Sequence, residues 1–346
     1  MKKSIFARFV VPFLFLLSPL LSEGVDGLTP ISETAEQGSQ KGTISNESNN
    51  LSPSPEEKNV SSGYAADLFR LEKEETLRER KHVFFALLAR NKEHILPTYL
   101  KCLENLEYDK KDITLYINTN NNTDRTEEIL TTWTKEHEPL YRKIIFESHN
   151  VEDLYYGSPH EWTMDRLHTL ALIRNKSLKL ASEEKSDYYF VVDCDNFIIP
   201  STLADLVAKD LPIVAPMLHS IPEPVDITSN FFAAVKEDGY YKHSNEFSSI
   251  IFREKIGTFK VPLVHCTYLI KTEYLNKLSY TDETEDYEFI IFARLARKNN
   301  ISQYICNEKV YGYNINFLRS ISLKEEKEVF PLLIPRIEKL VASVAA

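Results

Sequence analysis

The alternation of short apolar runs with amphipathic segments is the feature that most limits how this chain can fold. Apolar runs at 82–89, 112–118, 143–148 and 188–193 have the length of buried strands, and segments of helical period lie between them. Strands that are apolar on both faces and alternate with helices are typical of a parallel sheet that is covered on both sides. The sequence therefore predicts an α/β fold with a mostly parallel sheet and helices on both faces.

The amino-terminal region does not share this alternation. Lys2, Lys3 and Arg8 precede the apolar stretch "FVVPFLFLLSPLL", which predicts a secretory signal peptide over residues 1–22 or, alternatively, an uncleaved signal anchor. Either form would deliver the chain to the lumen of the secretory pathway (endoplasmic reticulum or Golgi) or export it. Only the anchor would attach it to a membrane.

The rest of the chain is expected to be a stem followed by one domain. Residues 23–63 are rich in Ser, Asn, Glu, Gly and Pro, which predicts a disordered stem. Residues 64–346 are expected to form a single domain with a core at about 82–316 and a helical carboxyl-terminal tail.

Composition excludes some classes of partner. The 346 residues carry a net charge of −10, which argues against broad binding of nucleic acid or of anionic membranes. The four cysteines are too few and too scattered for a disulfide scaffold or a CxxC zinc site.

Three polar stretches follow predicted strands. They are "RNKEH" with Arg90 and Asn91, "NTNNNTDRT" with Asn120 and Asp124, and "DCDN" at 193–196. Ligands of such sheets bind beyond the carboxyl ends of the strands, so these stretches are expected to share one crevice.

Asp193 and Asp195 are the strongest candidates for chemistry in that crevice. Two carboxylates at the end of a buried strand repel each other unless a cation is near, and an oxygen-ligated Mg²⁺ or Mn²⁺ bridging to phosphates would resolve this. One alternative is that the pair caps the helix that begins at "PSTLADL". Another is a phosphatase of the haloacid dehalogenase type, but Phe197 occupies the Thr or Val position of that motif.

A third metal ligand and a general base are expected downstream. His265 interrupts the apolar run "KVPLVHCTYLI" and is the best candidate ligand, although a lone His in such a run is often a core residue; His219 and His168 are weaker candidates. Asp286 and Glu288 precede a helical pattern and are candidate bases, with helix-terminus preference as the alternative.

Two arginines of the long helical segment at 164–181 are candidate ligands of a diphosphate. Arg166 and Arg174 could face that group, or they could lie on a solvated face of the helix.

Several strings in order resemble one family. "VVDCDNFI", "LPIVAPML", "FKVPLVHCTYL" and "CNEKVYGYN" are similar to the amino-terminal domain of the procollagen galactosyltransferase and cerebral endothelial cell adhesion molecule family, over roughly residues 82–316. The resemblance implies the GT-A fold with its Rossmann-like sheet, a UDP-galactose donor, and Mn²⁺ bound through Asp193 and Asp195. It supports His265 as a ligand and, through "WTMDRLHTL", places Trp162 and Arg166 near the donor.

The sequence also departs from the family pattern. Asn120 replaces an acidic residue, and Tyr287 and Glu288 stand where the family has two aspartates. Family members carry a second glycosyltransferase domain that is not found before Ala346, so an activity of that domain is not expected to carry over.

These observations predict a metal-dependent glycosyltransferase. It would move a hexose, which the resemblance implies is galactose, from a UDP-sugar to a hydroxyl of a glycan or protein acceptor, with collagen-like hydroxylysine as one candidate. The main alternative is an inactive relative that serves as a binding or adhesion module, and a phosphate-ester hydrolase is a further one.

Overall fold

The computed structural model describes residues 80–151, 163–222, 229–315 and 322–342. The chain divides into two units between Glu79 and Arg80, and all described residues belong to the second. The predicted signal segment and stem lie outside the described residues, as does Trp162.

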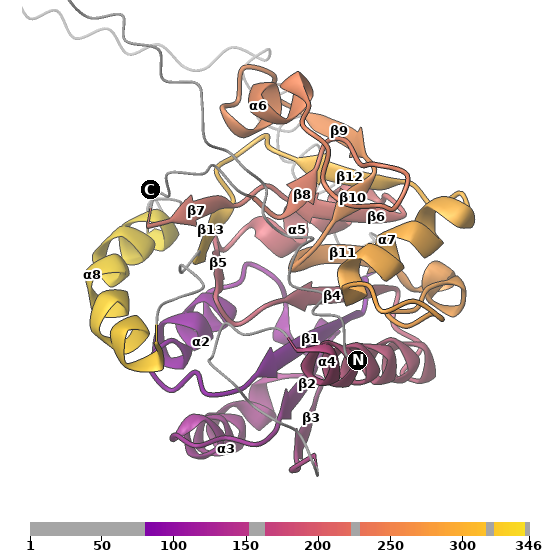
Figure 1. Cartoon of the computed structure of the whole chain (residues 1–346). Coiled ribbons are helices and arrows are strands. Elements are labelled where there is room, and N and C mark those ends of the chain that lie inside the picture. The colour runs from indigo at the N-terminus through magenta and orange to yellow at the C-terminus, as the bar shows by residue number, and fades with distance from the viewer. Residues whose placement is uncertain (1–79, 152–162, 223–228, 316–321, 343–346) are drawn as a thin grey trace, which may run out of the picture. The chain divides into compact units, whose positions relative to one another are not determined.

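A mixed sheet of eight strands forms the centre of this unit (Figure 1). In spatial order its strands are β3 (Lys143–Ser148), β2 (Ile113–Thr119), β1 (Val83–Ala89), β4 (Tyr188–Val192), β11 (Thr267–Lys271), β6 (Ile213–Pro216), β12 (Gln303–Cys306) and β9 (Thr258–Val261). β3, β2, β1 and β4 pair in parallel, as do β6 and β12, while β11 and β9 run antiparallel to their neighbours. The predicted mostly parallel α/β sheet is therefore confirmed, with two reversed strands that the sequence did not indicate.

The apolar run at 260–270 is divided among three strands. Pro262 has no N–H for a ladder and separates β9 from β10 (Leu263–Val264), which leaves the main sheet and pairs with β8 (Phe231–Phe232). Cys266 adopts the left-handed φ of 64° and separates β10 from β11. The break places His265 and Cys266 beside the end of β4, because Asp193 N donates to Cys266 O at 3.0 Å.

Alternate side chains of β1 enter two separate cores. Val83, Phe85 and Leu87 pack with apolar side chains of one set of helices, and Phe84 and Ala86 pack with those of another. The first set is α2 (Leu96–Glu104), α3 (Thr126–His137), α5 (Thr202–Lys209) and α8 (Leu323–Ala342), and the second is α4 (Met164–Glu183), α6 (Asn245–Ile251) and α7 (Glu288–Lys298). Short 3₁₀ turns occur at Lys110–Asp112, Glu138–Leu140 and Thr272–Lys277. The sheet is thus covered on both faces, as predicted.

A small second sheet continues from the "DCDN" stretch. It contains β5 (Asn196–Ile198), β13 (Gly312–Ile315) and β7 (His219–Ile221), in that order. A Cβ atom on Gly312 would lie 2.0 Å from the carbonyl oxygen of Phe197, so only glycine fits this close crossing of β13 and β5. The crossing fixes β13 against the strand that follows the aspartate pair.

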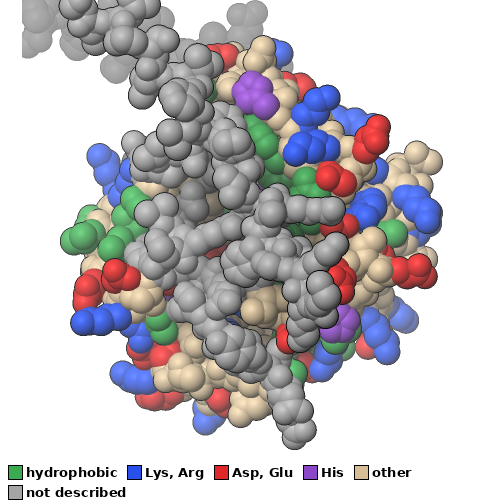
Figure 2. Space-filling view, viewed as in Figure 1, with side chains coloured by type: hydrophobic (Ala, Val, Ile, Leu, Met, Phe, Trp, Pro, Cys, Tyr) green, Lys and Arg blue, Asp and Glu red, His purple; other side chains and the backbone are tan. Residues whose placement is uncertain are grey.

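The surface carries charges of both signs. Figure 2 shows acidic and basic side chains interspersed around the visible rim of the described part of the chain. No described helix has both the length and the apolar composition needed to cross a membrane. The four cysteines, all of which are described, are free thiols, and Cys102, Cys194 and Cys306 are buried.

Candidate functional site

A cleft of about 350 Å³ opens at the carboxyl ends of β1, β2 and β4. Its volume lies within the range of roughly 300–1,000 Å³ that is usual for small-molecule sites. All three polar stretches contribute to it, with Arg90, Asn91, Lys92, Asn118, Asn120, Asp193, Cys194, Asp195 and Asn196 among the lining residues. The prediction that these stretches share one crevice is confirmed.

Side-chain hydrogen bonds tie the first two stretches together. Asn91 Oδ1 accepts from the Thr123 amide at 2.8 Å, and the Asn91 amide donates to Asn122 Oδ1 at 3.0 Å. The carboxylate of Asp124 accepts from the amides of Glu93 and Thr126 at 3.1 and 3.0 Å. Asp124 is not one of the cleft-lining residues, so the structure gives it the role of holding the two loops in register.

Asp193 is held by an arginine from α4. Arg174 Nη2 donates to Asp193 Oδ1 at 2.8 Å, and Arg174 Nε lies 3.8 Å from Glu288 Oε1 at the start of α7. The Arg174 side chain is only 6% exposed, and its Nε and Nη1 atoms have no hydrogen-bond partner among the described residues. One buried guanidinium therefore lies between a proposed metal ligand and a proposed base.

Asp195 is placed beside a lysine from the first loop. Lys92 Nζ lies 3.9 Å from Asp195 Oδ2 and 3.0 Å from Glu326 Oε1 on α8. The Glu326 side chain is fully buried, and His94 Nε2 also lies 2.9 Å from its Oε1 atom. The cation next to Asp195 is thus fixed by Glu326 of α8, which lies 234 residues after Lys92 in the chain.

Burial and neighbouring charges change the acidity of this group. Burial raises the pKa of Asp195, with Lys92 opposing the shift and Asp193 adding to it. Burial works against the charged form of Lys92, but the nearby Asp195 and Glu326 outweigh it and raise the pKa of Lys92. Lys92 is therefore a cation at neutral pH.

The helix-capping interpretation of the aspartate pair is wrong. Ser201 is the N-cap of α5, no side chain caps that helix, and Asp193 is instead bonded to Arg174. The pair lines the cleft, with 24% of the Asp193 side chain and 38% of the Asp195 side chain exposed.

His265 lies among aromatic rings next to the aspartates. Its ring centroid is 5.1 Å from that of Phe289 and 5.8 Å from that of Phe232, and Nδ1 lies 2.7 Å from Cys266 Sγ. Burial lowers the pKa of His265 to about 4, against the opposing charge of Asp193. The imidazole is neutral at pH 7, as a metal ligand must be. Cys266, the next residue, lines the cleft.

The two candidate bases differ in their surroundings. Asp286 accepts a hydrogen bond from Tyr240 Oη at 2.8 Å and is paired with Arg294. Burial raises its pKa, but these hydrogen bonds outweigh it and the net shift is downward. Glu288 is 7% exposed, and burial raises its pKa despite Arg174. The raised pKa makes Glu288 the better proton acceptor of the two.

Arg166 lines the cleft, in agreement with its predicted position, as do Arg90 and Asn120. Sequence reasoning missed Lys92 and Glu326, which also line it. The position of Lys92 inside "RNKEH" was a usable signal for the lysine. No local pattern distinguishes Glu326 from the other acidic residues of "SLKEEKEVF".

Asp193 and Asp195 could supply part of the coordination shell of a hard divalent cation. Among the described residues, no group of three His, Cys, Asp or Glu side chains is arranged to hold a metal ion, so Asp193, Asp195 and His265 do not form such a set. However, the ion pairs in the described ranges leave one carboxylate oxygen of each aspartate unused. Two carboxylates are enough for Mg²⁺ or Mn²⁺ when phosphate and water supply the other ligands.

Comparison with known families gives one match that covers most of the chain. Residues 80–332 match the description "Glycosyltransferase family 25, N-terminal domain". The matched range contains the whole sheet, the cleft and the first half of α8.

Curated relatives agree with this match. The chain is 35% identical to mouse procollagen galactosyltransferase 2 over 245 residues, which cover 68% of this chain and 39% of that protein. It is 33% identical to the mouse inactive glycosyltransferase 25 family member 3 over 73% of this chain and 44% of that protein. The chain thus spans about two fifths of the length of these relatives.

Solved structures with a similar fold include a fragment of Staphylococcus aureus TarS in complex with UDP-GlcNAc. That likeness has 15% identity and a TM-score of 0.47, and it covers 75% of this chain and 67% of the other.

Proposed function

The chain belongs to glycosyltransferase family 25, and we propose that it transfers a hexose, in the first instance galactose, from a UDP-sugar to an acceptor hydroxyl. The observation that carries the proposal is the cleft itself. It combines the GT-A sheet of this family with Asp193 and Asp195, two donor loops, and the cationic side chains of Arg90, Lys92 and Arg166. A nucleoside diphosphate needs cationic side chains because it is negatively charged when it binds. It also needs its developing negative charge to be stabilised when it leaves the sugar.

A divalent Mn²⁺ or Mg²⁺ on the free carboxylate oxygens of Asp193 and Asp195 would stabilise the charge of the departing diphosphate. The chain's own residues would do the rest. The two loops bind the nucleotide, with Asn120 available to hydrogen-bond the base or the ribose. Arg174 keeps Asp193 in place, and the ordered carboxylate accepts ligands without losing side-chain freedom on binding.

Glu288 is the proposed general base. It lies at the start of α7, 3.8 Å from Arg174, and its raised pKa suits removal of a proton from an acceptor hydroxyl as the sugar is transferred. Asp286 is less suited because Tyr240 and Arg294 already occupy its carboxylate.

A second candidate is a catalytically inactive binding module. It is favoured by the 33% identity to the inactive mouse family member and by the ion pair that occupies one oxygen of Asp193. Both candidate functions predict nucleotide binding, but only the first predicts transfer of the sugar.

The test is titration of the full chain with UDP-galactose, UDP-glucose and a GDP-sugar, with and without Mn²⁺, followed by an assay for sugar transfer to a hydroxylysine-containing peptide. Metal-dependent binding of a UDP-sugar that is lost in Asp195→Asn supports the proposal. The matched control is Asp210→Asn, a carboxylate that is 67% exposed at the opposite end of the sheet. If no nucleotide sugar binds in a metal-dependent way, the proposed donor chemistry is wrong. Binding without sugar transfer would favour the inactive module.

A further inference from the structure

Lys92 has hydrogen-bonding capacity that the fold does not use. Its ammonium group carries three donors, and among the described residues it makes one hydrogen bond, to Glu326 Oε1 at 3.0 Å. The next carboxylate, that of Asp195, is 3.9 Å away, which is beyond hydrogen-bonding distance. The Lys92 side chain lines the cleft and is 18% exposed, so its remaining donors are available to a ligand in the cleft.

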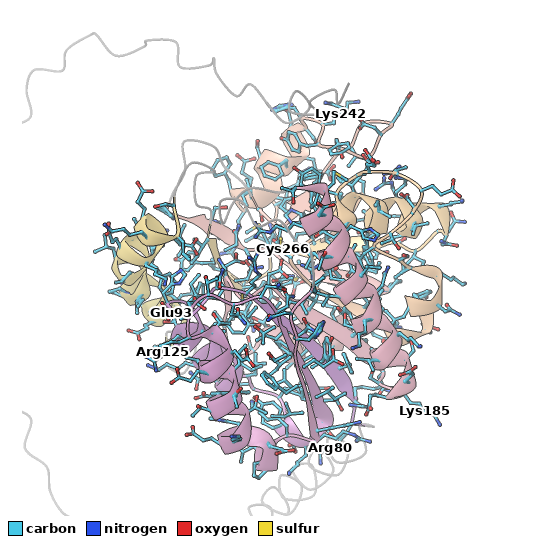
Figure 3. The ribbon with its side chains drawn as sticks, turned by 60° about the horizontal axis from the view of Figure 1, so that its bottom comes forward. Arg80, Glu93, Arg125, Lys185, Lys242 and Cys266 are labelled. Carbon is cyan, nitrogen blue, oxygen red and sulfur yellow. The ribbon has the colours of Figure 1, made fainter. Side chains whose placement is uncertain are left out.

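The lysine is anchored by a buried carboxylate of α8. Glu326, fully buried on α8, takes both Lys92 Nζ and His94 Nε2 on the same carboxylate oxygen. The next residue, Lys327, pairs with Glu93 on the same loop. Figure 3 shows Glu93 close to the near end of α8 and next to Arg125. Glu326 thus holds Lys92 itself, and Lys327 makes a separate, more exposed ion pair with the same loop.

Arg174, the other buried cation beside the aspartate pair, is less exposed than Lys92. Arg174 donates to Asp193 and lies against Glu288, so its charge is shared by two carboxylates of the core. Lys92 has a similar pair of carboxylates, Glu326 at 3.0 Å and Asp195 at 3.9 Å, but its side chain is 18% exposed against 6% for Arg174. It stands next to the aspartate that would share the diphosphate's metal.

We propose that Lys92 donates to the diphosphate of the nucleotide and that Glu326 and His94 position it for this contact. The inference rests on the proposed function in that the ligand is a nucleoside diphosphate. It adds α8, a segment that the sequence presented as a tail, to the donor site. Lys92 is the binding residue, and Glu326 and His94 are positioning residues.

The test is calorimetric titration of the full chain with UDP, uridine and inorganic pyrophosphate in the presence of Mn²⁺. In Lys92→Met, affinity for UDP and pyrophosphate should fall about 10- to 100-fold, the usual cost of a charged hydrogen bond, and uridine affinity should stay within about twofold. If Lys92 had only a structural role, its replacement would lower the affinity for uridine as much as the affinity for UDP. That result would overturn the inference. Unchanged UDP affinity also overturns it.

Two further variants keep the test valid. Lys92→Met alone leaves Glu326 buried without its lysine, which risks unfolding, so Lys92→Met/Glu326→Gln removes both charges together and should show the same selective loss. Lys327→Met is the matched control, because it removes a lysine that joins α8 to the same loop without lining the cleft. UDP affinity should then be unchanged.

Failure of the proposed function would be distinguishable. If the parent binds pyrophosphate but not UDP, the proposal of a UDP-sugar donor is wrong. The pyrophosphate titrations would still test the role of Lys92. If the parent binds neither, both proposals are overturned.

Discussion

Asp193 and Asp195 stand two positions apart in the chain, yet their cations come from different parts of the fold. Asp193 is paired with Arg174, which belongs to α4 and is 6% exposed. Asp195 faces Lys92, which belongs to a loop and is fixed by Glu326 of α8. The first half of the site is therefore built into the core of the domain, and the second half depends on a contact between a loop and the last helix.

The comparison shows that two aspartates of one motif can be held by cations from different environments, one in the core and one on a loop. The guanidinium near Asp193 also lies next to Glu288, so its loss affects two carboxylates in a dry environment. The lysine near Asp195 can be neutralised together with Glu326. We therefore expect substitutions in the first half to cost stability and substitutions in the second half to cost mainly ligand binding.

The largest effect is expected for Arg174→Met. The substitution leaves Asp193 and the buried Glu288 without their shared cation, and breaking such a pair typically costs about 3–5 kcal/mol of unfolding free energy. Urea denaturation followed by circular dichroism measures it. Arg125→Met, which breaks an exposed arginine–glutamate pair, is the control and should change little. A loss below about 1 kcal/mol for Arg174→Met would mean that the core does not depend on this cation.

Glu288→Gln should separate catalysis from binding. The amide keeps the shape of the side chain but cannot accept a proton, so turnover of the UDP-sugar should fall at least about 100-fold while UDP affinity changes little. Because burial raises the pKa of Glu288, the rate of the parent should fall with decreasing pH at values above the ordinary 4.5 of a glutamate. Asp286→Asn is the matched control. Equal loss in both variants would remove the distinction between the two bases.

His265 should make stability depend on pH on the Asp193 side of the site. Its folded pKa of about 4 lies below the ordinary 6.5, so the unfolded chain binds the extra proton between these values. In metal-free buffer the parent should lose up to about 3 kcal/mol as pH falls from 6.5 to 4. His265→Asn should lose correspondingly less over the same window, and the exposed His149→Asn should behave as the parent. Parallel pH curves for parent and His265→Asn would contradict the lowered pKa.

The smallest effect is expected on the α8 side. Lys327→Met removes a partly exposed pair with Glu93 and should cost about 0–1 kcal/mol in thermal or urea unfolding. A large loss of unfolding free energy would show that the contact between α8 and the loop depends more on Lys327 than on Glu326. The contrast between the two halves would then need revision.

Much of the architecture could be predicted because it follows from local patterns. The runs at 82–89, 112–118 and 143–148 are apolar at most of their positions, and the observed strands begin within one residue of them. The rule that ligands bind at the carboxyl ends of parallel strands then brought three polar loops together without any knowledge of their contacts.

The remainder could not be predicted because it depends on contacts between distant segments. An apolar run does not encode its direction in a sheet, so the reversal of β11 was not foreseeable from "HCTYLI". Arg174 was open to either a solvated or a cleft-facing reading, and only the packing of α4 against β4 and α7 decides that it is buried. The pairing of Lys92 with Glu326 joins residues 234 positions apart and has no local signal.

The burial of Glu326 has a practical consequence for dissecting this protein into smaller pieces. The core at 82–316, which the sequence suggested, contains every strand but lacks α8. A fragment cut there would retain the aspartate pair and Arg174 but expose the face against which Phe330 and Ile337 pack, and it would leave Lys92 without its anchor. A fragment intended for crystallisation or for transplanting this nucleotide cleft into another protein should therefore extend through residue 342.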